Sequence, residues 1–179
     1  MMRPGTAPSR RTLLGRIARA APLLVAPLLA ACGKDPPPPP PPPPPAAPPA
    51  PTIVSLTISA DQRLNPGPGG GSPSPVVLRL LQLTDVTAFN AADWFVLAAA
   101  GAGDLGGTVV FAEERLVTPG ATTVYQRRVE DGARYLGAVA GFKDLSGVWR
   151  GYFPLPPETT SLLELELAGS NLAIRRAGV

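Results

Sequence analysis

The stretch Ile53-Val54-Ser55-Leu56-Thr57-Ile58-Ser59-Ala60 decides the fold class, because its apolar and polar residues alternate with a period of two. Val54, Leu56 and Ile58 are separated by Ser55 and Thr57. Successive side chains of a β-strand point to opposite faces of the sheet, so this alternation predicts a strand with one covered face and one face in solvent.

The residues that follow have the same β character in short pieces. Residues 76–83 are nearly continuously apolar, which is typical of a central strand. Six further strands are expected, separated by turn sequences that include Thr118-Pro119-Gly120: 115–118, 123–129, 135–142, 148–153, 161–167 and 172–175. Leu163, Leu165 and Leu167 alternate with Glu164 and Glu166, which indicates a solvent-exposed outer face. About eight strands at this spacing predict a mostly β fold, a two-sheet β-sandwich.

One segment after the second strand breaks the β pattern. Residues 89–98 are predicted to form a helix with Asn90 as a candidate N-cap. The residues expected on its packed face are Phe89, Ala92, Phe95 and Val96. Trp94 and Phe95 are interpreted as packing anchors rather than as a ligand platform. A second short helical turn is expected at Asp104-Leu105, among the glycines that end this insertion.

The N-terminal part has the organisation of an exported lipoprotein precursor. A basic leader precedes the apolar stretch 20–31, which is shorter than the about 20 residues that a membrane-spanning helix needs. The stretch ends in Leu29-Ala30-Ala31-Cys32, a pattern typical of bacterial lipoprotein signal peptides, in which the cysteine thiol takes up a diacylglyceryl group. We expect residues 1–31 to be removed and Cys32 to carry covalent lipid.

Two features bear on export and sorting. Ser9-Arg10-Arg11-Thr12-Leu13-Leu14 resembles a twin-arginine export motif, but an ordinary basic leader for the general secretory route explains it equally well. Gly33 follows the lipid-modified cysteine, where aspartate would indicate retention at the inner membrane. The outer membrane, with the domain facing the periplasm, is therefore the expected location.

A proline-rich segment separates this leader from the strands. Pro36–Pro45 is an unbroken run of ten prolines, and residues 46–51 continue it with alanine and proline. Such a run forms an extended polyproline helix that rises about 3.1 Å per residue, so ten prolines give a semi-rigid spacer of about 30 Å. Residues 32–51 are thus interpreted as an acylated cysteine with a tether, and residues 52–179 as the folded domain. The less favoured interpretation is that the proline run is a ligand for a proline-recognising domain.

Charge and composition exclude several function classes. Five of the 16 basic residues precede Cys32, so the processed chain would carry 11 basic and 13 acidic residues, a net charge of −2, which does not favour nucleic-acid binding. There is no histidine in the sequence, which excludes histidine-dependent nucleophilic sites and the usual zinc sites. Gly67-Pro68-Gly69-Gly70-Gly71 lacks the Gly-Lys-Ser/Thr of a phosphate-binding loop. Glu113 and Glu114, interpreted as solvated loop charges, do not converge as a catalytic pair. We expect no enzyme activity, no cofactor other than the lipid, no metal and no small-molecule substrate.

The segment Asp61–Pro75 is the most unusual part of the predicted domain. It holds four glycines and four prolines in 15 residues, which is long for a loop in a compact domain. Long loops of this kind are often functional, and the prolines restrict the freedom that the glycines add. The pattern favours partner binding over catalysis, and the alternative is a flexible surface insertion without a partner.

The chain resembles the outer-membrane lipoproteins of the bacterial type VI secretion system, the TssJ/VasD/SciN family, over residues 29–175. The resemblance depends on an ordered set of short motifs: Leu29–Cys32, Leu64-Asn65-Pro66, Ser74-Pro75-Val76-Val77 with Arg79 and Gln82-Leu83, Phe89 with Asp93-Trp94-Phe95, Val117-Thr118-Pro119-Gly120, Tyr135–Ala140, and Trp149-Arg150. It implies a transthyretin-like sandwich with a helical insertion. This chain has Gly69-Gly70-Gly71 where family members often carry bulkier polar side chains.

The resemblance also implies a partner and a contact loop. The partner would be the periplasmic domain of the large inner-membrane subunit of the secretion system's membrane complex, a TssM/IcmF-like protein, and the contact would be the loop between the first two strands. The residues expected to make this contact are Arg63, Leu64, Asn65, Pro66, Gly67, Ser72 and Pro73. The alternative function is a lipoprotein that binds carbohydrate or peptidoglycan through its sandwich.

Overall fold

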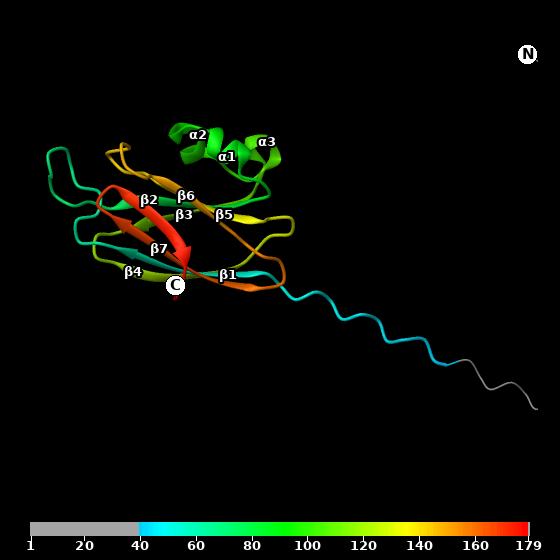
Figure 1. Cartoon of the computed structure of the whole chain (residues 1–179). Helices are drawn as coiled ribbons and strands as arrows, with labels where there is room; N and C mark the ends of the chain where they lie inside the picture. The colour runs from blue at the N-terminus through cyan, green and yellow to red at the C-terminus, as the bar shows by residue number, and fades with distance from the viewer. Residues whose placement is uncertain (1–39, 179) are drawn as a thin grey trace, which may run out of the picture. The chain divides into compact units, whose positions relative to one another are not determined.

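The structure is a computed structural model that describes residues 40–178, and its first strand begins at Ile53 (Figure 1). The predicted signal peptide, Cys32 and the start of the proline run lie outside the described residues. The elements are β1 (Ile53–Ala60), β2 (Val76–Leu83), α1 (Thr87–Ala91), α2 (Trp94–Ala99), α3 (Asp104–Gly107), β3 (Val109–Val117), β4 (Thr122–Arg128), β5 (Tyr135–Ala140), β6 (Arg150–Pro154), β7 (Thr160–Ala168) and β8 (Asn171–Arg176). Across residues 40–178, every helix is too short or too polar to cross a membrane.

The strands form two four-stranded sheets, as the sequence predicts for a β-sandwich. One sheet has the order β4-β1-β7-β8 and the other has the order β3-β2-β5-β6. All neighbouring strands are antiparallel except β1 and β7, which are parallel. Figure 1 shows the two sheets as layers, with the three helices on the outer side of the sheet that contains β2.

The first strand, β1, has the burial that its alternating sequence predicts. Val54, Leu56 and Ile58 are fully buried between the sheets, whereas Ser55 and Thr57 are only partly covered. The glutamate and leucine alternation of β7 is confirmed in the same way, because Leu163, Leu165 and Leu167 are buried in the same core.

The second strand, β2, is apolar on both faces because both faces are covered. Leu78 and Leu80 belong to the core between the sheets, whereas Leu81 and Leu83 pack on the outer side against the helical segment. A single polar side chain, Gln82, is buried in this strand at 1% exposure, and its Oε1 accepts the backbone N–H of Glu130 at 2.6 Å. This bond joins β2 to the chain that leaves β4 of the opposite sheet.

The prediction of one helix over 89–98 with an Asn90 cap is wrong. Two helices meet at Ala92 and Asp93, whose backbones are extended, and the Asp93 carboxylate accepts the backbone N–H of Val96 at 2.9 Å. Aspartate stabilises a new helix start more effectively than it stabilises a helix interior, which explains the break. Because the second helix restarts at Trp94, its buried residue is Leu97, and Phe95 and Val96 are 76% and 47% exposed. Phe95 is therefore not a packing anchor, although Trp94 is half-buried.

The predicted strand at 115–118 is too short, because β3 already begins at Val109. Val109 is buried against the helical segment, so the start of β3 lacks the alternation that would mark a half-covered strand. Glu113 and Glu114 therefore lie on a strand and not in a loop. They point to opposite faces: Glu113 pairs with Arg115 at 2.9 Å, and Glu114 pairs with Arg79 at 2.9 Å. The first two strands have the predicted bounds, and the ends of the others differ from the predicted ones by at most two residues. A short α3 lies where a helical turn is expected.

Candidate binding surface at the loop end of the sandwich

The connection between β1 and β2 consists of a fixed base and a projecting tip, which we call the arm and define as residues 66–73. In Figure 1 the arm is the teal segment that extends beyond the strand ends at the left. Its base is closed by the Ser74 backbone N–H, which donates to the carbonyl of Leu64 at 3.0 Å. The base is bonded to β7 by the Asp61 N–H, which donates to the carbonyl of Leu167 at 2.9 Å.

Asn65 joins this base to two other loops. Its Nδ2 donates to Ser74 Oγ at 3.1 Å and to the carbonyl of Pro75 at 3.0 Å, which closes the base of the arm. Its Oδ1 accepts the backbone N–H of Lys143, between β5 and β6, at 2.8 Å. Its own N–H donates to Gly169, in the β7–β8 turn, at 2.8 Å. The residue has a φ of 50°, a left-handed conformation that asparagine tolerates better than most residues.

The other two loops are also bonded to each other. The Val148 N–H donates to Asn171 Oδ1 at 3.0 Å, and the Leu172 N–H donates to the Val148 carbonyl at 2.6 Å. Only glycine fits at position 147, because an added Cβ would lie 2.5 Å from the carbonyl oxygen of Ser170. The β1–β2, β5–β6 and β7–β8 connections thus form one continuous surface at this end of the domain.

The tip of the arm is a closed turn rather than an open loop. The Gly67 carbonyl accepts the N–H groups of both Gly70 and Gly71, at 3.2 and 3.0 Å. Gly69 and Gly70 have φ angles of 68° and 83°, which side chains disfavour, and a Cβ on Gly71 would lie 3.2 Å from Gly67 Cα. The glycines are therefore required by the shape of the tip.

A groove lies on either side of the arm, and each groove is lined by one cation that has no acidic partner in the described part of the chain. One groove, of about 400 Å³, lies between the arm and Lys143, Asp144 and Ser170. The other, of about 410 Å³, lies between the arm and Asp61 and Arg63. Among the described residues, neither Arg63 nor Lys143 has an acidic group within 4.0 Å.

The carboxylates of the two grooves bond to backbone N–H groups instead. Asp61 accepts from Gly169 at 3.2 Å and Asp144 accepts from Ser146 at 2.9 Å. The Ser146 bonds lower the pKa of Asp144 below its ordinary value, so this group is ionised at neutral pH. The free cations are consequently the more available charges for a partner.

The structure places the residues predicted for partner contact in two groups. Arg63, Ser72 and Pro73 are exposed, and Pro66 and Gly67 are partly exposed. Leu64 and Asn65 are only 0% and 3% exposed, so their side chains hold the surface together rather than face a partner. Lys143, Asp144 and Ser170 were not predicted for this surface, because no sequence pattern reveals which distant loops meet.

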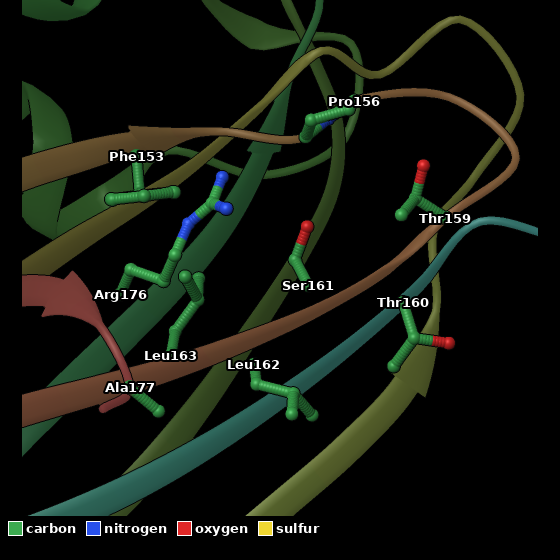
Figure 2. Close-up of a pocket in the computed structure, with 9 residues that line it drawn as sticks. All are labelled: Phe153, Pro156, Thr159, Thr160, Ser161, Leu162, Leu163, Arg176 and Ala177. Carbon is green, nitrogen blue, oxygen red and sulfur yellow. The ribbon is translucent and has the colours of Figure 1, made fainter. Parts of the chain in front are cut away.

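A third cavity, of about 210 Å³, lies between the end of β8 and the connection from β6 to β7 (Figure 2). In the view of Figure 2 the Arg176 guanidinium lies between Phe153 and the Ser161 hydroxyl. Its lining contains no carboxylate that could act as an acid or base. Within residues 40–178, no three side chains of the histidine, cysteine, aspartate and glutamate classes gather as a metal site.

Comparisons with known proteins agree with this architecture. A family model described as type VI secretion lipoprotein (VasD, EvfM, TssJ) matches residues 52–170. The crystal structure of the type VI secretion lipoprotein TssJ1 from Pseudomonas aeruginosa is 34% identical to the chain, with a TM-score of 0.67, and the match covers 72% of this chain and 98% of that one.

Two further structures match over a similar length. Serratia marcescens Lip, described as a membrane-bound component of the type VI secretion system, is 26% identical over 70% of this chain and 98% of its own, with a TM-score of 0.63. A chain in a structure described as the C-terminal domain of the type VI secretion protein TssM from EAEC is 25% identical over 70% of this chain and 99% of its own, with a TM-score of 0.57. No curated protein sequence matches the chain.

Proposed function

The chain belongs to the type VI secretion lipoprotein family, and from this premise we propose that it anchors the secretion system's membrane complex at the outer membrane. In this proposal Cys32 carries the lipid, residues 32–51 are the tether, and the domain at 52–179 faces the periplasm. The domain binds the periplasmic part of the large inner-membrane subunit, a TssM-like protein. The matching chain in the TssM structure supports this choice of partner.

The observation that best supports the proposal is that hydrogen bonds hold the base of the arm and close its tip. An unbraced loop of this composition would lose much conformational entropy when it bound a partner, since ordering each backbone residue costs about 1–2 kcal/mol. Here the base is already fixed by Asn65, and the tip is closed by the Gly67 carbonyl. A preorganised projection keeps more of its interaction energy for binding, which favours recognition over a surface insertion without function.

The two cations beside the arm, which have no acidic partner within residues 40–178, support an acidic surface on the partner. Arg63 and Lys143 flank the arm on its two sides. Exposed charges of this kind raise the association rate more than they raise the affinity, and salt screens them. Binding should therefore slow as ionic strength rises.

The first test removes the tip of the arm without disturbing its base. Gly67 and Gly71 are already in contact, so deletion of Pro68, Gly69 and Gly70 can be closed by one peptide bond while Asn65 keeps its partners. The full chain, extracted in detergent, should bind the purified periplasmic domain of the cognate inner-membrane subunit, and the deletion should weaken this binding about tenfold or more. Biolayer interferometry would measure the affinity of the wild type and of the deletion variant.

A bulky substitution provides the matched control for the deletion. Ser72→Trp adds a large side chain to the arm, and Thr160→Trp adds the same side chain at an exposed position near the start of β1. The first should impair binding and the second should not. Equal affinity of the deletion variant and the wild type would exclude the arm as the contact.

The second test concerns the anchor. In cells, the Cys32→Ala chain should lose incorporation of labelled palmitate and should leave the outer-membrane fraction, because a protein without acyl chains has no such apolar anchor. A Ser55→Ala chain, altered on the partly covered face of β1, should fractionate as the wild type does. A Cys32→Ala chain that remained with the outer membrane would refute the lipid anchor.

A further inference from the structure

A continuous apolar stripe crosses the outer face of the sheet that contains β2. Leu116 of β3 and Val77 of β2 are directly paired, and they are 69% and 44% exposed. Beyond Val77 lies Gly141, where an added Cβ would be 3.9 Å from Val77 Cβ and 3.7 Å from the indole of Trp94. The Trp94 ring then contacts Phe95, with 5.2 Å between ring centroids. We call these five residues the stripe.

The middle of the stripe is hollow. A groove of about 310 Å³ separates α2 from the sheet. It is lined by Trp94 and Ala98 of α2, by Val77, Val139 and Gly141, and by the Arg79–Glu114 ion pair. The indole N–H of Trp94 is shielded from solvent and has no acceptor among the described residues. A buried donor without an acceptor is uncommon in a completed structure. Exposed apolar surfaces with a hollow centre and a charged edge are typical of protein interaction sites.

The stripe is continuous with the arm surface along two segments of the chain. Val77 follows the end of the arm base, Pro75, by two residues. On the neighbouring strand, Gly141 donates its N–H to the Val77 carbonyl at 2.9 Å, and Lys143, two residues later, donates its N–H to Asn65. A partner that covered the arm would therefore lie against the edge of the stripe.

The composition of the arm explains why such a partner needs the stripe. Binding energy at interfaces is concentrated in a few tryptophan, tyrosine and arginine side chains and in other large side chains that fill pockets. The arm has only proline, glycine and serine, so it provides shape and backbone groups but no anchor side chain. Phe142, next to Lys143, is buried in the core, so the aromatic residues that the stripe offers to a partner are Trp94 and Phe95. Phe95 is 76% exposed although it is a large apolar side chain.

We propose that the stripe is the apolar half of one docking surface whose other half is the arm, and that the same inner-membrane subunit covers both with apolar side chains placed on the groove. This inference rests on the proposed function. It adds that the arm determines orientation and that the stripe provides most of the affinity. A second copy of this chain on the stripe is the competing occupant.

The test compares apolar-to-serine substitutions on the two outer faces of the sandwich. Phe95→Ser and Leu116→Ser remove exposed side chains from the stripe, and neither side chain is part of the core. Leu162→Ser and Val124→Ser are the matched controls, since these side chains are 56% and 68% exposed on the outer face of the other sheet. All four are made in the full chain in detergent, with circular dichroism as the check of folding.

The expected result is that Phe95→Ser weakens binding to the subunit's periplasmic domain by about tenfold or more and Leu116→Ser by about threefold or more, while both controls stay within about twofold. Hydrogen exchange should also slow at residues 94–98 and 115–117 of the wild type when the subunit is added. This second measurement does not depend on any variant.

Two results would overturn the inference and leave the proposed function intact. One is loss of binding on deletion of the arm tip together with wild-type affinity of both stripe variants. The other is a dimer of the wild type in light scattering that Phe95→Ser abolishes, with unchanged binding to the subunit. Failure of the wild type to bind the subunit would overturn both the proposed function and the inference.

Discussion

Asn65 shows how one buried side chain can organise a surface made of three loops. Both polar atoms of its amide are used, and they connect the arm base with the β5–β6 loop, while its backbone N–H reaches the β7–β8 turn. Aspartate could replace the acceptor at Oδ1 but not the two donors at Nδ2. The Leu64-Asn65-Pro66 motif is therefore a structural motif in this chain, in which Leu64 fills the core and Asn65 fixes the loops.

Asn65→Gly removes this side chain without straining the backbone, because glycine adopts the left-handed conformation without steric conflict. The substitution removes three side-chain hydrogen bonds worth about 0.5–1.5 kcal/mol each, so we expect the free energy of unfolding to fall by about 2–4 kcal/mol. Urea denaturation followed by tryptophan fluorescence would measure the change.

The control for Asn65→Gly is Ser72→Ala, at an exposed arm position, which should change stability by less than about 0.5 kcal/mol. Asn65→Asp should lie between the control and Asn65→Gly, because the bond from Lys143 is retained. Wild-type stability of Asn65→Gly would mean that the three loops hold their positions without this residue.

At the scale of the elements, two arginines attach the helices to the sheet below them. Arg150 of β6 donates to the carbonyls of Phe89 and Asn90 at 3.0 and 2.8 Å, at the end of α1. Arg79 of β2 donates to the carbonyl of Ala100, directly after α2. Helices of five and six residues are too short to be stable alone, so these contacts and the burial of Phe89 and Leu97 hold them.

The elements also show which parts of the fold local sequence can predict. The alternation in β1 and β7 is a property of single strands, so it predicted their buried faces correctly. The early start of β3 depends on what covers its outer face, and that is known only once the helices lie on the sheet. The break at Asp93 is local, because the carboxylate caps the helix that follows it, but the apolar residues on both sides of Asp93 predicted one continuous helix. The parallel pairing of β1 with β7 joins residues more than 100 positions apart, and no local pattern encodes it.

The same distinction applies to the candidate site. The glycines and prolines predicted a projecting loop, because those residues determine backbone conformation locally. The position of Lys143 beside the arm depends on tertiary contacts between separate loops, and so does the continuity of the arm surface with Trp94 and Phe95. The resemblance to the lipoprotein family pointed to Trp94, Phe95 and Arg150 as motif residues but did not reveal that one of them is largely exposed.

At the scale of the whole molecule, the tether and the arm are attached at opposite ends of β1. The tether joins at Ile53 and the connection to the arm begins after Ala60, so the eight residues of the strand place about 26 Å between them. If Cys32 is in the outer membrane, as proposed, ten prolines in an extended polyproline helix would add about 31 Å of spacer. In the proposed function, the distance that the arm can reach from the lipid would depend on the stiffness of the proline run.

This arrangement predicts that the stiffness of the proline run affects assembly with the inner-membrane subunit in the cell but does not affect binding in detergent. A ten-residue Gly-Ser segment in place of Pro36–Pro45 would have a mean span of only about 17 Å, although its contour length is similar. We expect this variant to bind the isolated inner-membrane subunit with wild-type affinity, since the docking surface is unchanged. In cells, less of that subunit should be recovered with the outer-membrane fraction, because the effective concentration of the arm at the partner falls when the mean span is too short.

A five-fold Pro-Ala repeat in the same place is the control, since it keeps an extended chain and should restore recovery to the wild-type level. The comparison separates reach from affinity, because both variants carry an identical domain. Wild-type recovery with the Gly-Ser segment would show that the proline run sets no distance. Reduced affinity of that variant in detergent would show instead that the run contacts the partner directly, as a proline-recognition ligand does.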